Sequence, residues 1–451
     1  MSTLTISIVI AFIVGYMFIA LESVTKVNKA AVALLMFVVC WTLYMISPGS
    51  YNPGVSIDAI PQAVSDIIEK HLGSTSTTLF FLMGAMTIVE IVDQNGGFDW
   101  VQKVMSTKNK RVLLWRITFL TFFLSAILDN MTTSIVMIMI LRKLVQKRKD
   151  RLIYASLIII AANSGGAFSP IGDVTTIMLW NKGLITAVGV IKEVFIPSLI
   201  SVIVPALFMQ TQLKGNFVDS GNIQFASEAD AKLQEFSSRQ RKSLFFIGCG
   251  GLILVPVFKS ITNLPPFVGT LLVLSILWII TEIFYRRLHR HDSKITFQKR
   301  VSTLLRNVDM STILFFLGIL MAVSCLEEVG VLKMLGLGLN TTFHGNHYMV
   351  TGIIGFLSSI VDNVPLVAGC MGMYPIQATG DMAVNGIFWQ LLGYCAGVGG
   401  SMLIIGSAAG VVVMGLEKIT FGWYMKHVSW IAFLGYIAGI ASYWCMRTFL
   451  M

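Results

Sequence analysis

Charged residues are scarce in this chain. Of its 451 residues only 12% are Asp, Glu, Lys or Arg, while 55% are hydrophobic. Soluble domains carry about 25% charged residues, so an ordinary soluble fold is excluded. Many apolar runs instead approach the roughly 20 residues that a helix needs to cross a bilayer. The composition therefore predicts an all-α integral membrane protein whose main surroundings are lipid.

Residue types that carry enzymatic or metal chemistry are also few. The six cysteines all fall in apolar segments and are interpreted as buried thiols, not as disulfides or metal ligands. The six histidines lie in loops or at helix ends without a partner at metal-ligand spacing, and no protease-type motif is present. We therefore expect neither an enzyme nor a bound cofactor. The net charge of +10 lies in short loops, mostly on one side, which argues against nucleic acid as a partner.

The chain carries one pattern twice, about 234 residues apart. In the first half, Asp129-Asn130 lies in an apolar stretch and is followed by Gly165-Gly166. In the second half, Asp362-Asn363 is followed in the same way by Gly399-Gly400. An ionisable residue within the membrane is costly and marks a functional site. Matching broken helices in two halves are typical of secondary transporters, whose site lies at the repeat interface.

The distribution of basic residues predicts the topology. Two apolar stretches, 112–141 and 348–374, are too short for two crossings and too interrupted for one. Lys and Arg flank the first stretch on both sides and are nearly absent around the second, so the positive-inside rule places their ends on opposite sides of the membrane. We therefore expect two opposed re-entrant hairpins, with about ten transmembrane helices and both termini external. The helices are expected near 4–21, 29–47, 78–94, 152–180, 190–212, 244–260, 265–285, 311–328, 388–416 and 428–447.

The expected organisation is an inverted-topology repeat. An N-terminal helix (1–28) precedes the first repeat (29–212), and a cytoplasmic linker (213–243) joins it to the second repeat (244–447). Each repeat holds one hairpin and one broken helix.

Local signals predict where the helices break. In the 152–180 helix we expect the break at 163–170, which contains two glycines and Pro170. In the 388–416 helix we expect it at 397–401. Residues 57–72 have helical spacing and are expected to lie along the external surface as a separate element.

Oxygen-bearing side chains at the tips and breaks form a candidate ion site. Na⁺ takes oxygen ligands from carboxylates, amides, hydroxyls and free backbone carbonyls. The aspartates are expected to bind cation and proton, whereas the amides and hydroxyls either ligate the ion or cap the broken backbone. The candidates are Glu90, Asp129, Asn130, Thr132, Asn163, Ser164, Asp173, Thr175, Asp362, Asn363 and Ser401. Na⁺ or Li⁺ is expected at Asp129, Asn130, Asp173, Asp362 and Asn363.

Four runs resemble a known family. LDNMTT at 128–133, AANSGGAFSPIGDVTT at 161–176, VDNVP at 361–365 and GVGGS at 397–401 are similar to the NhaD family of Na⁺(Li⁺)/H⁺ antiporters. The resemblance covers nearly the whole chain and adds Ser358 to the candidate site. It implies Na⁺, Li⁺ and H⁺ as substrates and Na⁺ export in exchange for external protons. It also implies a transport domain that slides against a scaffold, a homodimer, and a bacterial cytoplasmic membrane.

Two other classes of protein share some of these features. A Na⁺-coupled carboxylate symporter or an arsenite-type anion carrier of the same superfamily has a similar layout. It requires a basic or amide-rich pocket, and the sequence places no Lys or Arg near the two Asp-Asn tips. A passive channel is less favoured, because channels usually line a pore with several subunits, whereas an inverted repeat argues for alternating access.

Overall fold

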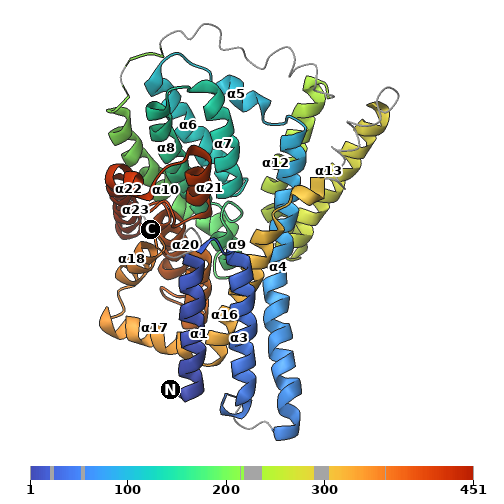
Figure 1. Cartoon of the computed structure of the whole chain (residues 1–451), viewed down its shortest axis with the longest axis vertical. Helices are drawn as coiled ribbons and strands as arrows, with labels where there is room; N and C mark the ends of the chain where they lie inside the picture. The colour runs from blue at the N-terminus through green and yellow to red at the C-terminus, as the bar shows by residue number, and fades with distance from the viewer. Residues whose placement is uncertain are drawn as a thin grey trace.

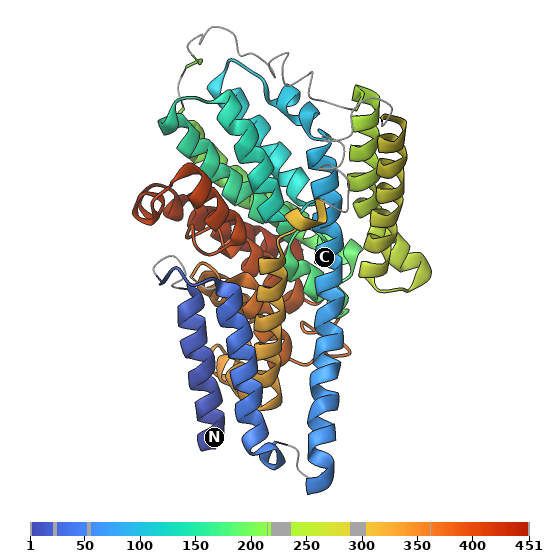
Figure 2. The same ribbon diagram turned by 45° about the vertical axis from the view of Figure 1, so that its right-hand side comes forward.

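The structure is a computed structural model that describes residues 2–20, 25–51, 56–213, 215–217, 236–288, 304–360 and 362–449. Within these ranges the regular elements are helices, and one isolated β-bridge joins Asn109 to Asn216. Figures 1 and 2 show the helices as an elongated bundle. The expected all-α fold is confirmed for the described part of the chain.

The helices follow one another in two similar series. In the first half they are α1 (Thr3–Ala20), α3 (Lys29–Ile46), α4 (Ile60–Gln94), α5 (Asp99–Met105), α6 (Lys110–Ser125), α7 (Asn130–Leu144), α8 (Arg148–Ala167), α9 (Val174–Asn181) and α10 (Ala187–Gln210). In the second half they are α12 (Ser238–Thr262), α13 (Pro266–Leu288), α16 (Met310–Glu328), α17 (Val331–Thr342), α18 (His347–Leu357), α19 (Asn363–Met373), α20 (Ile387–Gly399), α21 (Ala408–Glu417), α22 (Phe421–Tyr424) and α23 (Trp430–Phe449). The order α4 to α10 is thus matched by α16 to α23.

Seven helical segments among the described residues are long and apolar enough to cross a membrane. They are α3, α4, α10, α12, α13, α16 and the segment from α22 to α23. The other three expected crossings correspond to α1 and to the interrupted segments α8–α9 and α20–α21, which are not among those seven. The chain is an integral membrane protein, and the number of crossings stays a prediction.

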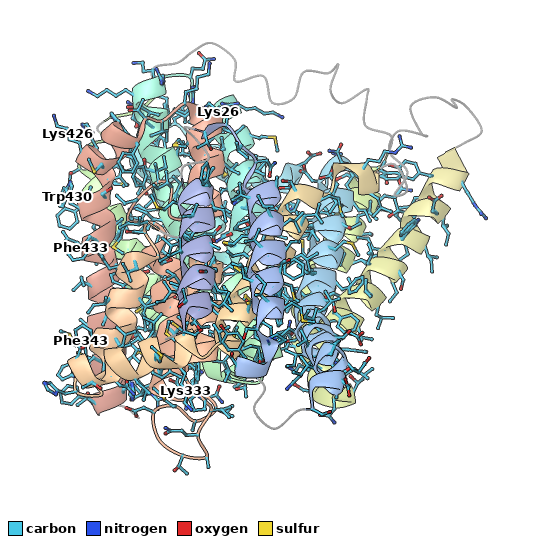
Figure 3. All side chains as sticks on the ribbon, turned by 60° about the horizontal axis from the view of Figure 1, so that its bottom comes forward. Lys26, Lys333, Phe343, Lys426, Trp430 and Phe433 are labelled. Atoms are coloured by element: carbon cyan, nitrogen blue, oxygen red, sulfur yellow. The ribbon has the colours of Figure 1, made fainter. Side chains whose placement is uncertain are left out.

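The surface of the bundle has the pattern of a membrane protein. Figure 3 shows Lys26 and Lys426 at one end of the helices and Lys333 at the other, with Trp430 and Phe433 on the side between them. The side chains of Trp430 and Phe433 are 49% and 41% exposed. Large exposed apolar side chains of this kind are stable where they face lipid instead of water.

The chain reverses direction at each Asp-Asn pair. Lys110 at the start of α6 forms an ion pair (2.7 Å) with Asp150 at the start of α8, so α7 must return to the end of the molecule where α6 began. In the second half, the rings of His347 (α18) and Tyr374 (after α19) both contact Phe388. Figure 1 shows α6 and α7 near the upper end of the molecule and α18 lower down.

Corresponding hydrogen bonds occur in the two halves. Ser125 at the end of α6 donates to the carbonyl of Ala162 in α8 (2.6 Å), and Ser358 at the end of α18 donates to the carbonyl of Ala396 in α20 (2.7 Å). Each bond joins the tip of a hairpin to the adjacent broken helix. The repeat seen in the sequence therefore extends to the packing of its elements.

The paired glycines allow close approach of helices. A Cβ atom at Gly165 would overlap the carbonyl oxygen of Phe122, and one at Gly399 would overlap that of Gly355. Each glycine thus lets a broken helix touch the backbone of the hairpin helix beside it. This contact explains why the predicted position of the first helix break, 163–170, is wrong. The glycines serve packing, so α8 continues to Ala167 and the break falls at 168–173.

Three other boundaries also differ from the sequence prediction. Residues 57–72 do not form a separate surface helix, because they belong to a short 3₁₀ turn and to α4, which runs unbroken to Gln94. Hydroxyls such as that of Thr77 are satisfied by a carbonyl of the preceding turn (2.8 Å), so the polarity of this stretch does not require the helix to end there. The break in the second half is at 400–407, and α12 begins at Ser238 with a capping box, inside the expected linker. Residues 218–235 of that linker lie outside the described residues.

The helices form two groups. We call one group the scaffold helices; it consists of α1, α3, α4, α12, α13 and α16. Within it, α3 of the first half packs on α16 of the second half, and α13 of the second half packs on α4 of the first. We call α6 to α10 and α18 to α23 the site helices, in which α10 packs on α23 and each hairpin packs on a broken helix. The two groups meet where α4 and α16 contact α9 and α19.

The close approach at Gly165 can be tested by stability. We expect Gly165→Ala to lower the free energy of unfolding by about 1–3 kcal/mol, because its methyl group meets a backbone carbonyl that cannot rotate away. Gly415→Ala, in α21 where a Cβ meets nothing within 4 Å, is the matched control and should not destabilise. Thermal unfolding in detergent, followed by tryptophan fluorescence, measures both. Equal midpoints for the two variants would contradict the assigned packing.

Candidate cation site

Each of Asp129, Asp173 and Asp362 is the N-cap residue of a helix. Asp129 accepts a hydrogen bond from the backbone N–H of Thr132 at the start of α7 (2.8 Å), and Asp173 accepts one from Thr175 at the start of α9 (2.9 Å). Asp362 caps α19 in the same way. Aspartate is among the best N-cap residues, so the local sequence that starts each helix also fixes its carboxylate. Ser407 has this role in α21.

Asp173 lies at the centre of the arrangement and is 1% exposed. Asn130, from the first hairpin, donates its amide to Asp173 Oδ2 (2.8 Å). Asn363, from the second hairpin, donates to both carboxylate oxygens (3.3 and 3.4 Å). The Thr175 hydroxyl donates to Oδ1 (2.8 Å). Two hairpins from opposite halves of the chain therefore meet on one buried carboxylate whose hydrogen-bond partners are all neutral.

Asn163 joins the two broken helices. Its amide nitrogen donates to the hydroxyls of Ser401 and Ser407 (both 2.9 Å), and its oxygen accepts from Asn130 (3.0 Å). Asn163 is fully buried. Through this one side chain, elements of both halves are held in register around Asp173.

The electrostatics of the site follow from these contacts. The starts of α7, α9, α19 and α21 converge, and each helix start carries about half a positive charge, about two in total. Asp129 and Asp362 lie close enough to Asp173 to interact with it electrostatically. When ionised, three carboxylates exceed the helix ends by about one negative charge. A site of this kind suits one monovalent cation, or protons on the carboxylates.

A small cavity adjoins the first hairpin tip. It has a volume of about 50 Å³ and lies between Asp129 and Asn130 on one side and Ala85, Val89 and Phe316 of the scaffold helices on the other. One water molecule occupies about 30 Å³ in the liquid, so the cavity has room for a small hydrated group beside the carboxylate. Among the described residues there is no cluster of three or more His, Cys, Asp or Glu side chains that suits a metal ion. The side-chain groups that contact Asp173 are two amide nitrogens and one hydroxyl.

Not every predicted residue lies in this cluster. The Thr132 hydroxyl bonds to Asp129, the Ser164 hydroxyl accepts from Ser201 (2.9 Å), and Ser358 bonds to a backbone carbonyl. Glu90 accepts a hydrogen bond from Gln94 one turn further along α4 (3.1 Å). The structure therefore brings together Asn130, Asn163, Asp173, Thr175, Asn363 and Ser401, with Asp129 and Asp362 beside them.

One residue at the site was missed. The ammonium group of Lys29, the first residue of α3, lies 3.7 Å from Asp362 Oδ2. The expectation that no basic residue lies near the tips is therefore wrong, because Lys29 is distant in sequence and reaches Asp362 through the packing of α3. A signal was present in the sequence, since a lysine at a helix start is opposed by the helix dipole.

A helical membrane protein with two similar sets of broken helices around a buried carboxylate has the layout of many membrane transporters. Residues 16–391 match the family model described as CitMHS, citrate transporter. The chain is 42% identical to "Sodium/proton antiporter 1" of Arabidopsis thaliana, over 97% of this chain and 72% of that protein. It is 29% identical to "Na(+)/H(+) antiporter NhaD" of Vibrio cholerae (97% and 91%) and 30% identical to the protein of that name from Alkalimonas amylolytica (95% and 88%). The chain thus belongs to the citrate transporter family as an NhaD-type member, and the family resemblance is confirmed.

Mutations can separate the role of Asn163 from that of the adjacent Ser164. We expect Asn163→Ala to abolish the stabilisation of the protein by NaCl relative to choline chloride, because the two broken helices lose their shared bond. Ser164 is equally buried, but its side chain bonds only to Ser201. The Ser164→Ala variant should therefore keep the stabilisation by NaCl. A bound ion raises the midpoint of thermal unfolding, which is the measurement. If the Ser164 variant alone lost the stabilisation by NaCl, the role assigned to Asn163 would belong to Ser164 instead.

Proposed function

We propose that this protein is a secondary Na⁺(Li⁺)/H⁺ antiporter that exports cytoplasmic Na⁺ in exchange for external protons. The observation that carries the proposal is the buried Asp173 carboxylate, whose hydrogen-bond partners are neutral and come from both hairpins. A buried carboxylate without a compensating cation is costly. Either a proton or a Na⁺ ion removes this cost, and the two cannot occupy one oxygen together. Several relatives named as sodium/proton antiporters support the same exchange.

The proposed cycle uses the three aspartates as shared ligands. Na⁺ from the cytoplasm displaces protons from one or more of Asp129, Asp173 and Asp362. The loaded site becomes accessible from outside, Na⁺ leaves, and external protons return to the carboxylates. Asn130, Asn163, Thr175, Asn363 and Ser401 supply neutral oxygens or hold the carboxylates in place. Thr132, Ser164, Ser358 and Glu90 are proposed in supporting positions.

The grouping of the helices suggests how access alternates. We propose that α6–α7 and α18–α19 are re-entrant hairpins entering from opposite sides, in an inverted repeat of 29–212 and 244–447. The site helices would move as one body against the scaffold helices, because the carboxylates lie on the former and α4 and α16 border them. A homodimer joined through scaffold helices would hold those helices still in the bilayer.

The membrane and the orientation are also proposals. Basic residues flank α6 and α7, so by the positive-inside rule we propose that this end of the molecule faces the cytoplasm and that both termini lie outside. We assign the chain to a bacterial cytoplasmic membrane. Relatives occur in a plant as well as in bacteria, so the proposed exchange is not tied to that one membrane.

An anion carrier is the second candidate, favoured by the name of the family model and by four converging helix starts. Helix starts attract anions. Three of the four are capped by Asp129, Asp173 and Asp362, which occupy the positions where a carboxylate substrate would bind. The observed caps therefore favour a cation.

Exchange can be measured in everted membrane vesicles from cells without their own Na⁺/H⁺ antiporters. We expect Na⁺ and Li⁺ to restore acridine-orange fluorescence in respiring vesicles that contain the wild type. Asp173→Asn should lose at least about 90% of this response, because an amide neither binds a proton at the cell's pH nor carries the negative charge that a Na⁺ ion neutralises. Asp150→Asn, which changes an acid paired with Lys110 outside the site, is the control and should respond normally.

Two results would contradict the proposal. One is a wild-type protein that is present in the membrane but gives no response to any alkali cation. The other is Na⁺-dependent citrate uptake by the same vesicles, which would make the anion carrier the correct assignment.

A further inference from the structure

The contact between Lys29 and Asp362 joins the two groups of helices. Lys29 is on the scaffold helix α3, and Asp362 is at the tip of the second hairpin. Their side chains are 27% and 20% exposed, so the pair is mostly shielded from solvent. The other ion pairs of the described site helices, such as Arg151–Glu417 and Arg447–Glu193, remain within that group.

Lys29 is held firmly on the scaffold side. Asn28 caps α3 by accepting from the N–H of Ala30 (2.8 Å) and donates to the hydroxyl of Ser311 on α16 (3.0 Å). The Lys29 ammonium lies 4.4 Å from the centre of the Phe315 ring, also on α16. Such a cation–π contact is favourable where the ammonium has lost water. Contacts with α3 and α16 therefore hold Lys29 on the scaffold side of its contact with the hairpin.

The two hairpin tips differ in this respect. At the first tip, the cavity beside Asp129 is lined on the scaffold side by neutral residues, among them Ala85, Thr312 and Phe316. At the second tip, Asp362 faces a fixed ammonium group, with the buried hydroxyl of Tyr16 from α1 close by. The inverted repeat is thus broken at one carboxylate, which already has a cation in the absence of Na⁺.

The net charge of the site explains why the lysine beside the second hairpin tip matters. Three ionised aspartates exceed four helix starts by about one negative charge, and the charge of Lys29 compensates this excess. A Na⁺ ion entering the site would do the same. Lys29 and Na⁺ are therefore alternative ways of neutralising one set of carboxylates.

We propose that Lys29 is a tethered cation that competes with Na⁺ for Asp362 and holds the second hairpin against the scaffold while the site is empty. Lys29 is a positioning residue in this scheme, and the inference rests on the proposed antiport. Na⁺ or a proton on Asp362 weakens the pair and frees the hairpin tip. After Na⁺ leaves and Asp362 is ionised, the pair forms again and keeps the empty site from moving. Lys29 thus favours movement of the loaded site over movement of the empty one.

The test is the apparent KM for Na⁺ in everted vesicles at fixed pH. We expect Lys29→Met to lower the KM about two- to fivefold, the range that a partly shielded ion pair supports, because Na⁺ no longer displaces an ammonium. Lys29→Arg keeps the charge and should keep a KM close to that of the wild type. A decrease in maximal rate alone would indicate a structural role and would overturn the proposal.

Lys259→Met is the matched control. Lys259 is also a lysine on a scaffold helix that reaches a site helix, but its ammonium contacts the carbonyl of Trp180 (3.1 Å) and the ring of that residue. Its removal breaks a bridge between the groups without exposing a carboxylate, and should leave the KM for Na⁺ unchanged. An equal fall in KM for both variants would show that any weakened bridge suffices and would overturn the role of charge.

Na⁺-dependent thermal stabilisation of the purified variants gives a second readout, which works even if Lys29→Met transports slowly. The proposal requires stabilisation at lower Na⁺ in Lys29→Met than in the wild type, and no such difference when Asp362→Asn is present in both. The measurements distinguish a failure of the proposed antiport from a failure of the proposed competition by Lys29. Without Na⁺-dependent exchange by the wild type, the antiport fails. With normal exchange and an unchanged Na⁺ dependence in Lys29→Met, only the competition fails.

Discussion

Asp173 holds a carboxylate that is 1% exposed, in contact with Asn130, Thr175 and Asn363. Much of the architecture serves to place this group. Both hairpins turn beside it, one broken helix starts at it, and Asn163 ties in the other. Removing a carboxylate from water costs several kcal/mol unless it is paired, and no single partner observed here supplies a full positive charge. The fold thus holds a buried negative charge that a small cation or a proton can neutralise.

Backbone packing makes that arrangement possible. Gly165 and Gly399 let each broken helix touch the hairpin beside it, and the bonds from Ser125 and Ser358 pin the hairpin tips to those helices. Larger residues would separate the helix starts, and their partial charges would then no longer act on one place. The same converging helix starts are suited to an anion when their caps are neutral. Aspartate caps reverse that preference, which explains how a member of the citrate transporter family can be adapted to a cation.

Much of this was predictable from the sequence, and the exceptions have physical reasons. Repeated Asp-Asn pairs and glycines in apolar segments indicated the two halves and most of the residues around Asp173, because buried polar groups there require partners. The position of the break after Ala167 was not predictable, since a glycine pair in a helix signals either a break or a close contact. The length of α4 was missed because its polar stretch at 74–78 bonds to its own backbone. Lys29 was missed because only tertiary packing brings α3 to the second hairpin.

In the proposed antiporter, Na⁺ and protons occupy the same carboxylates, centred on Asp173. The most direct test is to add Na⁺ to the purified protein in a weakly buffered detergent solution and record the pH with an indicator dye. We expect that Na⁺, but not choline, releases protons at a pH where the empty site is protonated, and that Asp173→Asn abolishes the release. Na⁺ binding without any release of protons would contradict it, because the ion and the proton would then have separate sites.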